Sequence, residues 1–338
     1  MNQKSVITVY RGGMAESEHQ LHLAAVRLDG TVLASCGDPG RWTFARSSAK
    51  PLQAIPLVEA GGMDACGLTD AELALVCASH NGEALHVGLA AGILAKLGLD
   101  ASALQCGAHD PYHKPTAEAM KAAGTPPTAL HNNCSGKHSG MLALAKTIGA
   151  PTEGYLALTH PVQQRMLAVI SAMSGVAGDR IRLGVDGCGV PVFGLPLASL
   201  ALAFARLGTP EGLDSQRASA CRRIVAAIRT RPECLAGEDR FDTQLIRVTG
   251  GKLVGKLGAE GVFAVTMPDT GCGLAVKVGD GSVRALYPAV TEALLQLGWL
   301  SAAEAEKLAA FHRPSLHNWQ GSVVGEIVPE FTLERHPA

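Results

Sequence analysis

The stretch Arg46-Ser47-Ser48-Ala49-Lys50-Pro51 marks the point where the pattern of the sequence changes from strand to helix. Proline is favourable only in the first turn of a helix, so Pro51 predicts that a helix begins near Ser47 or Ser48. Side chains three residues apart share one face of a helix, which brings Ser47 beside Lys50 and turns Ser48 elsewhere. The spacing predicts a serine nucleophile paired with a lysine, with the helix start stabilising a developing oxyanion. A helix-capping serine and a solvated lysine are the structural alternative.

The patterns on both sides of this stretch predict a mixed α/β fold. Alternating polar and apolar residues indicate strands at 4–10 and 21–35, whereas residues 51–99 have helical periodicity. Further helices are predicted at 117–123, 137–148, 162–173, 197–207 and 215–229, and strands at 243–256, 262–267, 273–278 and 283–287. We therefore expect a single domain, 1–338, whose largely helical middle portion, about 51–230, packs on a sheet from both termini.

The composition excludes several classes of protein. The chain has 338 residues, of which 47% are hydrophobic and 17% charged, enough to bury a large core. A net charge of -1 without a basic stripe argues against nucleic acid as a partner. Residues 1–13 lack the apolar core of a signal peptide, and glycines and prolines interrupt the longest uncharged stretch, 187–205, so no membrane partner is expected. Nine irregularly spaced cysteines favour reduced thiols and a cytoplasmic location.

Two further short motifs, Ser79-His80-Asn81 and Lys256-Leu257-Gly258, follow the first along the chain. The order Ser-x-x-Lys, Ser-x-Asn, Lys-x-Gly resembles that of the penicillin-recognising serine enzymes. A lysine acts as a base only when burial or a second ammonium lowers its pKa, so two lysines would be useful. We expect Lys50 to take the proton of Ser47, while Ser79 and Lys256 relay a proton to the leaving group. A helix-capping Ser79 and an exposed Lys256 are the structural alternatives.

A second cluster of reactive side chains opens another predicted helix, in residues 131–138. Cys134, Lys137 and His138 stand at i, i+3 and i+4 and share one face. A helix start and nearby cations lower the pKa of a cysteine, which makes Cys134 a candidate nucleophile or metal ligand. Cys188 lies in a glycine-rich turn, where backbone can approach a bound group closely. Purely structural roles are the alternative, because the sequence has no Cys-x-x-Cys zinc pattern.

Taken together, these motifs resemble those of the rhizobial-type, or class 3, L-asparaginases, whose fold is like that of serine β-lactamases, penicillin-binding proteins and glutaminases. The segments that carry the resemblance are 46–51, 78–83, 131–138, 186–191 and 240–243. The resemblance implies an enzyme that hydrolyses the side-chain amide of L-asparagine through an acyl-enzyme. The implied catalytic pairs are Ser47 with Lys50 and Ser79 with Lys256. The sequence does not fix the strand register near these two lysines, so Lys252 is the alternative to Lys256 as the second catalytic lysine.

The same resemblance implies a zinc ion, a set of substrate-binding groups and a homodimer. One Zn²⁺ per chain would have a water molecule and three protein ligands, Cys134, Lys137 and Cys188. The ion would support substrate binding while the serine performs the chemistry. The implied substrate-binding residues are Arg46, His138 and Asp186, of which Asp186 suits the α-ammonium group and a cation suits the α-carboxylate.

Three other functions compete with this interpretation. A glutaminase would share the fold and mechanism, and one substrate methylene is worth only about 1–3 kcal/mol in a pocket. A β-lactamase or penicillin-binding protein is disfavoured, since such proteins are exported and no signal peptide is visible. A non-catalytic metal-binding or redox-sensing protein could be built on Cys134 and Cys188, but it would leave Ser47, Lys50 and Ser79 without a role.

Overall fold

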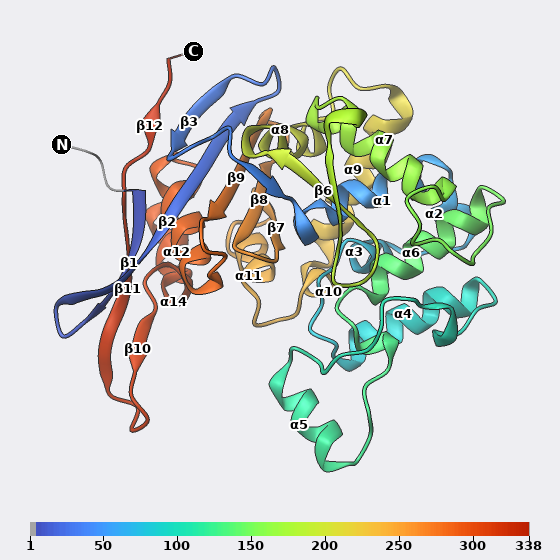
Figure 1. Ribbon diagram of the computed structural model, residues 1–338, viewed down its shortest axis with the longest axis horizontal. Coiled ribbons are helices and arrows are strands. Elements are labelled where there is room, and N and C mark those ends of the chain that lie inside the picture. Colours follow the sequence, from blue (N-terminus) through green and yellow to red (C-terminus); the bar gives the residue numbers. More distant parts are fainter. Residues whose placement is uncertain (1–4, 338) are drawn as a thin grey trace. The chain divides into compact units, whose positions relative to one another are not determined.

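The computed structural model describes residues 5–337, and its chain passes repeatedly between two units (Figure 1). The first, here called the sheet unit, comprises residues 1–48, 195–209 and 244–338. The second, the helical unit, comprises residues 49–194 and 210–243. The expectation of one domain over residues 1–338 stays a prediction.

The sheet unit is built around one sheet, in which nine strands are found within residues 5–337. The hydrogen-bonded path runs β10, β11, β1, β2, β9, β8, β7, and β3 pairs with β2 and β12. The strand bounds are β1 Ser5–Arg11, β2 Met14–Arg27, β3 Val32–Cys36, β7 Val254–Gly258, β8 Val262–Met267, β9 Cys272–Val278, β10 Ser315–His317, β11 Val323–Phe331 and β12 Glu334–Arg335. β1 pairs antiparallel with β11, so the sheet joins segments from both ends of the chain.

Two helices cover opposite faces of this sheet. α8 (Leu197–Gly208) packs on β9 so closely that a Cβ on Gly273 would collide with the carbonyl oxygen of Ala201. Thr266 is the cross-strand partner of Gly273 and shares its face, whereas Phe263, three residues away, faces the other side. The ring of Phe263 contacts Tyr287 edge-on at 6.4 Å, which places α12 (Val283–Gln296) on that other side. The core of the unit therefore has a helix above and below the sheet.

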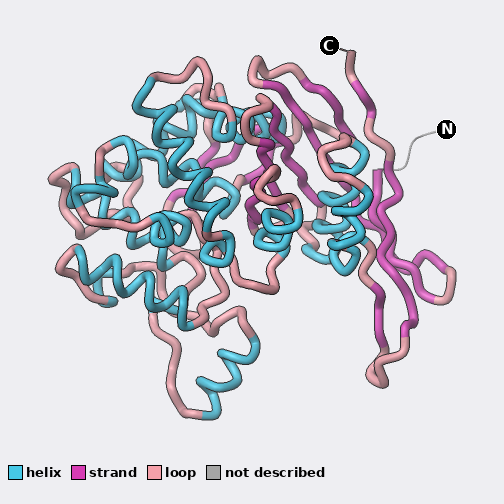
Figure 2. Tube along the Cα trace, turned by 180° about the vertical axis from the view of Figure 1, so that it is seen from behind, coloured by secondary structure: helices cyan, strands magenta, loops and turns pink. Residues whose placement is uncertain are grey.

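The helical unit is centred on α1 (Lys50–Glu59), which contacts α3, α6, α7 and α9. Figure 2 shows these segments mainly as helix, with a short antiparallel pair of β5 and β6. The bounds are α2 Gly62–Ala65, α3 Asp70–Val76, α4 Ala84–Lys96, α5 Lys114–Ala122, α6 Ser135–Thr147, α7 Pro161–Ser174, β5 Arg182–Val185, β6 Pro191–Pro196, α9 Ser215–Thr230 and α10 Pro232–Leu235. The first eight residues of α1 are all buried, which makes it the core helix of this unit.

The helix predicted near Ser47 or Ser48 begins later than expected. Residues Arg46–Ala49 form a 3₁₀ turn, and α1 begins at Lys50 with Pro51 in its first turn. Arg46 has a φ of 50°, in the left-handed region, where it turns the chain after β4 (Trp42–Phe44). Short 3₁₀ turns often precede an α-helix because they tighten its first hydrogen bonds. The proline rule therefore located the turn correctly and placed the α-helical start two or three residues too early.

Two strand predictions are wrong. Residues 243–256 contain most of α11 (Phe241–Val248) and only the first half of β7, and residues 283–287 form the start of α12. Periodicity cannot separate helix from strand in apolar runs this short, and tertiary packing decides between them. The remaining helices are α13 Ala302–Lys307 and α14 Ala309–His312. The strands predicted at 262–267 and 273–278, the predicted helices and the mixed α/β class are confirmed, with small shifts at element ends.

Within residues 5–337, no helix is both long enough and apolar enough to cross a membrane.

Candidate active site

Lys50, at the start of α1, has a wholly buried amine with three oxygen partners. Its side chain is 1% exposed. Its Nζ donates to the carbonyl oxygen of Ala78 at 2.6 Å, to Ser79 Oγ at 3.0 Å and to the carbonyl oxygen of Asn133 at 3.4 Å. A lysine held this way has a fixed position and lies in direct hydrogen-bond reach of one serine hydroxyl. The helical unit thus contains a buried Lys–Ser pair, Lys50 with Ser79.

Backbone hydrogen bonds fix the segment that carries Ser79. The amide of Ser79 donates to Leu235 O at 3.0 Å, and that of Asn81 to Ala236 O at 2.7 Å. Ser79 follows α3 and lies well before α4, whose N-cap is Glu83, so it is not the N-cap of an α-helix. The helix-capping alternative for Ser79 is therefore excluded.

The Asn81 carboxamide is held on both sides by charged residues. Its Nδ2 donates to Asp239 Oδ1 at 2.7 Å, and Arg240 Nη1 donates to its Oδ1 at 2.9 Å. Arg240 belongs to one of the motifs of the sequence, whereas Asp239 lies outside these motifs. Because the two charges meet opposite ends of one amide, they fix which way it points.

The two serines of the 3₁₀ turn have different environments in the sheet unit. Ser48 is wholly buried, and its Oγ donates to the carbonyl oxygen of Ala45 at 2.7 Å. Ser47 is half-buried. The end of β7 lies against this turn, because a Cβ on Gly258 would stand 2.7 Å from Ala45 O. Ser48 is therefore tied into the turn, and Ser47 is the more accessible hydroxyl.

Lys256 and Lys252 differ sharply in their surroundings. Lys256, on β7 two residues before Gly258, is 1% exposed, and its Nζ donates to the carbonyl oxygen of Leu257 at 2.9 Å. Lys252 is 42% exposed and binds both carboxylate oxygens of Glu304, at 2.8 and 2.9 Å. The exposed, strand-ending alternative for Lys256 is excluded, since its side chain lies inside the sheet unit.

Cys134 and Cys188 form a buried pair of thiols in the helical unit. Cys134 is the N-cap residue of α6, close to the helix start that the sequence predicts, and Lys137 Nζ donates to Cys188 Sγ at 2.9 Å. The pKa of Cys134 lies well below its usual value, because it accepts a hydrogen bond from Cys188 and because Lys50 and Lys137 stabilise the thiolate. The hydrogen bond to Cys134 and burial raise the pKa of Cys188. The two thiols are therefore coupled, and the thiolate form is favoured at Cys134 over Cys188.

A tight turn presents Cys188 to this pair. Asp186 N donates to Val190 O, and Gly189 N donates back to Asp186 O, both at 2.8 Å, with Gly189 at a φ of 88°. The half-buried Asp186 also accepts a hydrogen bond from Gly187 N at 2.8 Å. A glycine at position 189 is needed because its φ lies in the left-handed region.

The chemistry of Cys134, Lys137 and Cys188 fits Zn²⁺. Two thiolates and one amine are three donors, which leaves a fourth tetrahedral position for water. Burial alone would lower the pKa of Lys137, but the two cysteines and Asp186 outweigh it and raise that pKa. A bound cation would take up the thiolate charge and so remove what keeps the amine protonated. No cluster of three or more His, Cys, Asp or Glu suited to a metal occurs among residues 5–337.

His138 is buried beside this cluster, and its two ring nitrogens have different surroundings. Its Nδ1 lies 2.7 Å from the hydroxyl of Tyr155, whereas Nε2 has no hydrogen-bond partner within the described part of the chain. Burial, Lys137 and Lys50 hold the pKa of His138 well below its usual value, so the ring is neutral. Sequence reasoning missed Tyr155, because a lone tyrosine in a loop forms no motif.

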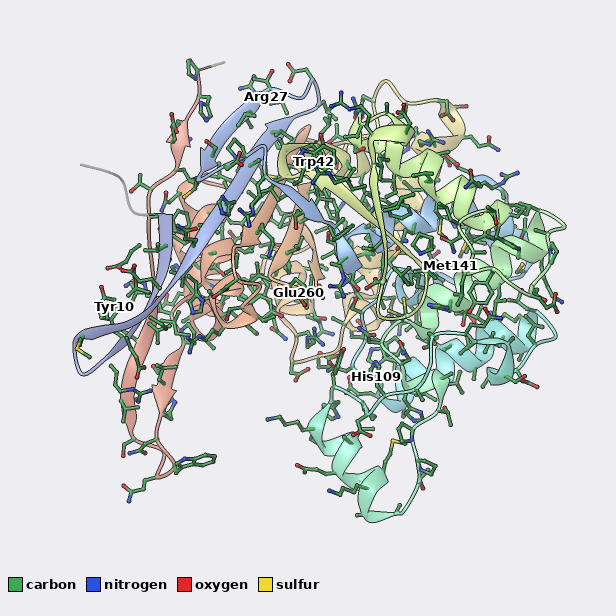
Figure 3. All side chains as sticks on the ribbon, in the orientation of Figure 1. Tyr10, Arg27, Trp42, His109, Met141 and Glu260 are labelled. Carbon is green, nitrogen blue, oxygen red and sulfur yellow. The ribbon has the colours of Figure 1, made fainter. Side chains whose placement is uncertain are left out.

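Arg46, the remaining predicted site residue, lies in the sheet unit with its Nη1 3.9 Å from Glu260 Oε1 (Glu260 is labelled in Figure 3). The predicted site residues thus fall into two sets. The helical unit holds Lys50, Ser79, Cys134, Lys137, His138 and Asp186 with Cys188, and the sheet unit holds Arg46, Ser47 and Lys256.

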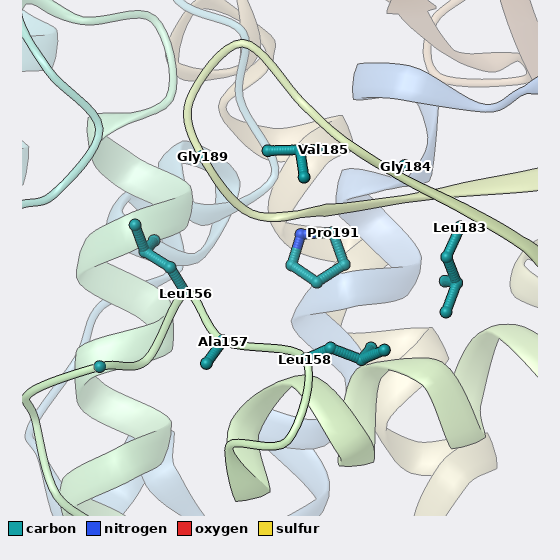
Figure 4. A pocket seen from close by; sticks show the side chains of 9 residues that line it. Leu156, Ala157, Leu158, Leu183, Gly184, Val185, Gly189 and Pro191 are labelled. Carbon is teal, nitrogen blue, oxygen red and sulfur yellow. The ribbon is translucent and has the colours of Figure 1, made fainter.

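A cavity of about 650 Å³ in the helical unit is not the site of this chemistry (Figure 4). Its lining is glycine and apolar residues, namely Gly154, Leu156, Ala157, Leu158, Leu183, Gly184, Val185, Gly189 and Pro191. Figure 4 shows aliphatic side chains and one proline around it. A pocket without a titratable or hydrogen-bonding side chain has no group for hydrolysing an amide.

Comparison with models of known protein families identifies the family to which the chain belongs. The family model described as L-asparaginase II matches residues 7–329, nearly the whole sequence. The chain belongs to the L-asparaginase II family, which makes it an asparaginase-type hydrolase of amides. This confirms the resemblance read from the motifs.

Similar solved structures are more distant. One, described as Mglu, has 15% sequence identity and a TM-score of 0.42. The match covers 82% of this chain and 65% of that protein, just under two thirds of its length. Another, a β-lactamase from Mycobacterium bovis, has 16% sequence identity and a TM-score of 0.44. That match covers 81% of this chain and 93% of the β-lactamase. A search of curated proteins gave no significant match. These distant likenesses give no information about substrate.

Proposed function

We propose that this protein is an L-asparaginase in which Ser47 is the nucleophile and Lys50 the general base. The observation that carries the proposal is the buried Lys50 amine, which hydrogen bonds to Ser79 and stands three residues from the accessible Ser47 in a chain of the L-asparaginase II family. A nucleophilic serine needs an adjacent base because its own hydroxyl is a weak nucleophile at neutral pH.

The proposed reaction proceeds through an acyl-enzyme. Ser47 Oγ attacks the side-chain amide carbon of L-asparagine as neutral Lys50 takes its proton. The amide C–N bond then breaks, and the nitrogen leaves as ammonia after receiving a proton through Ser79 and Lys256. Water then attacks the resulting ester, the bond to Ser47 Oγ breaks, and one proton of that water passes to Ser47 as L-aspartate leaves. The buried position of Lys256 and the exposed ion pair of Lys252 support Lys256 in this role.

For the substrate's charged ends we propose Arg46, Asp186 and His138. Arg46 matches the α-carboxylate and Asp186 the α-ammonium group, since each pair has opposite charge. We also infer a homodimer from the family resemblance and a cytoplasmic location from the many reduced thiols.

Zn²⁺ is the proposed metal, with Cys134, Lys137 and Cys188 as its ligands. When bound, it would supply positive charge and a water position that support substrate binding. The protein's own part is to hold two sulfurs and one amine within one buried cluster.

Ammonia release by the purified chain tests the proposed activity directly. We expect release from L-asparagine to exceed release from an equal concentration of L-glutamine at least about tenfold, because one misplaced methylene costs about 1–3 kcal/mol. Equal or faster release from L-glutamine would favour the glutaminase alternative. No release from either amide, with or without added Zn²⁺, would contradict the proposal.

Zinc binding is tested by replacing Cys188 with alanine. The wild-type chain should bind one Zn²⁺, and Cys188→Ala should weaken binding by at least about 100-fold, since a direct ligand matters more than the outer groups whose loss costs 10–100-fold. Equilibrium dialysis with metal analysis measures both. Cys221→Ala is the matched control, because Cys221 is a wholly buried thiol of α9, with a pKa raised by burial to about 12. Unchanged zinc binding in Cys188→Ala would exclude this ligand set.

A further inference from the structure

Tyr155 and His138 form a buried pair whose hydrogens can be assigned from their partners. Both side chains are 0% exposed. The Tyr155 oxygen lies 2.7 Å from His138 Nδ1 and accepts the backbone N–H of Gln105 at 2.9 Å. The two rings meet edge-on, with centroids 5.5 Å apart. The Tyr155 backbone is itself anchored, since Gln163 Nε2 donates to its carbonyl oxygen at 2.8 Å.

The phenol has one proton, and His138 Nδ1 is its acceptor. Gln105 N–H already donates to the phenol oxygen, and within residues 5–337 the only other partner of that oxygen is Nδ1. If Nδ1 donated instead, the phenol proton would be buried without an acceptor, which costs about 1–3 kcal/mol. The favoured arrangement has Tyr155 donating to Nδ1, and a neutral imidazole that accepts at Nδ1 carries its proton at Nε2.

This leaves a buried donor without a partner. Nε2 of His138 is inaccessible to solvent and has no hydrogen-bond partner among the residues described. His138 follows Lys137 directly and lies one helical turn after Cys134, so the donor lies beside the proposed zinc ligands, and His138 is itself one of the proposed substrate-binding residues. A buried N–H of this kind gains a hydrogen-bond partner when an oxygen atom of a ligand binds beside it. Because the ring is already fixed, that hydrogen bond costs no rotational entropy of the histidine side chain.

We infer that Tyr155 is a positioning residue, which holds His138 as an Nε2–H donor to an oxygen atom of the bound substrate. The inference rests on the proposed function for the identity of that ligand, an amino acid with carboxylate and amide oxygens. The inference also implies that His138 is not a ligand of the proposed Zn²⁺. While Nε2 carries its proton it has no lone pair for Zn²⁺, whereas Lys137 would become a ligand by losing a proton when the cation binds.

Nitrogen NMR of the full chain, labelled with ¹⁵N-histidine and loaded with Zn²⁺, tests the assignment without any substrate turnover. The chain has 12 histidines, and the signal lost in His138→Ala identifies this ring. We expect an unprotonated Nδ1 and a protonated Nε2 in the wild type, and a mixture of both tautomers in Tyr155→Phe. A protonated Nδ1 in the wild type, loss of the Nε2 proton in the presence of Zn²⁺, or an unchanged tautomer in Tyr155→Phe would each overturn the inference.

Kinetics test the link to substrate. Tyr155→Phe should raise KM for L-asparagine about tenfold, the equivalent of one hydrogen bond, and change kcat less than about threefold. In a His138→Ala background the same substitution should have no further effect on KM, because Tyr155 acts through His138. Tyr112→Phe, which alters an exposed tyrosine, is the matched control.

The outcomes separate this inference from the proposed function. An equal KM effect of Tyr155→Phe with and without His138 would contradict a positioning role and indicate a general loss of packing. A wild-type chain that hydrolyses no amide would overturn the proposed function. In that case, a protonated Nε2 in the wild type that becomes a mixture of both tautomers in Tyr155→Phe would still support Tyr155 as the residue that positions His138.

Discussion

Ser47→Ala should lower kcat for L-asparagine by about 10⁴-fold or more, the loss seen when a nucleophile that acts as a unit with its base is removed. The reason is chemical, because alanine has no oxygen to form the ester with the aspartyl group. Ser47 is half-buried and its replacement removes few contacts, so the thermal unfolding temperature should stay within a few degrees of the wild type. Ammonia release and calorimetry on the same preparation measure the two quantities.

Ser48→Ala is the matched control for this experiment. Its hydroxyl is buried and bound to Ala45 O, so its loss should cost about 1 kcal/mol of stability and leave kcat within an order of magnitude. Full activity in Ser47→Ala together with inactivity in Ser48→Ala would transfer the nucleophile to Ser48. Inactivity only in Cys134→Ala would instead indicate a cysteine nucleophile.

Lys50→Met should lower kcat by about 10²–10⁴-fold, the usual contribution of a general base. The Met side chain has similar length, so it fills the same buried space but cannot take the Ser47 proton or bond to Ser79 Oγ. Ala78 O and Asn133 O lose a hydrogen-bond donor, and some stability is lost with it. Circular dichroism should show an unchanged fold, which distinguishes lost chemistry from unfolding.

Lys252→Met provides the comparison for a lysine outside the site. Its exposed ion pair with Glu304 should be worth less than about 1 kcal/mol, and kcat should not change. If Lys50→Met kept wild-type turnover, Lys50 could not be the base. If Lys252→Met were as inactive as Lys50→Met, the preference for Lys256 as the second lysine would be wrong.

The sequence predicted best the elements whose signals are long or chemically distinct. α6 was placed correctly because Cys134 precedes a long helical pattern, and α8 because its apolar face is continuous. The segment 283–287 was misjudged, since a short run of Val, Leu and Tyr suits both a strand and the start of α12. Its assignment depends on Phe263 packing against Tyr287, a contact between residues distant in sequence.

The same limit applies to the site. The pairs within a motif could be anticipated, since Cys134 and Lys137 are helical neighbours. The partners of Lys50 could not, because two of them are backbone carbonyls of Ala78 and Asn133, which every residue type provides. The bond between Tyr155 and His138 joins a loop to a helix and has no sequence spacing of its own.

The pairing of β1 with β11 has a consequence for the order in which the protein forms. The Thr8 hydroxyl donates to Glu330 Oε2 at 2.6 Å, across 322 residues of chain. Contacts so distant in sequence form slowly, because a very long loop must close before they contribute any stability. Most of the helical unit is one continuous segment that can gain its contacts while synthesis continues, whereas the sheet cannot be completed until β11 has been made. The turn that carries Ser47 belongs to the sheet unit, so the nucleophile reaches its final surroundings only after β11 has been made.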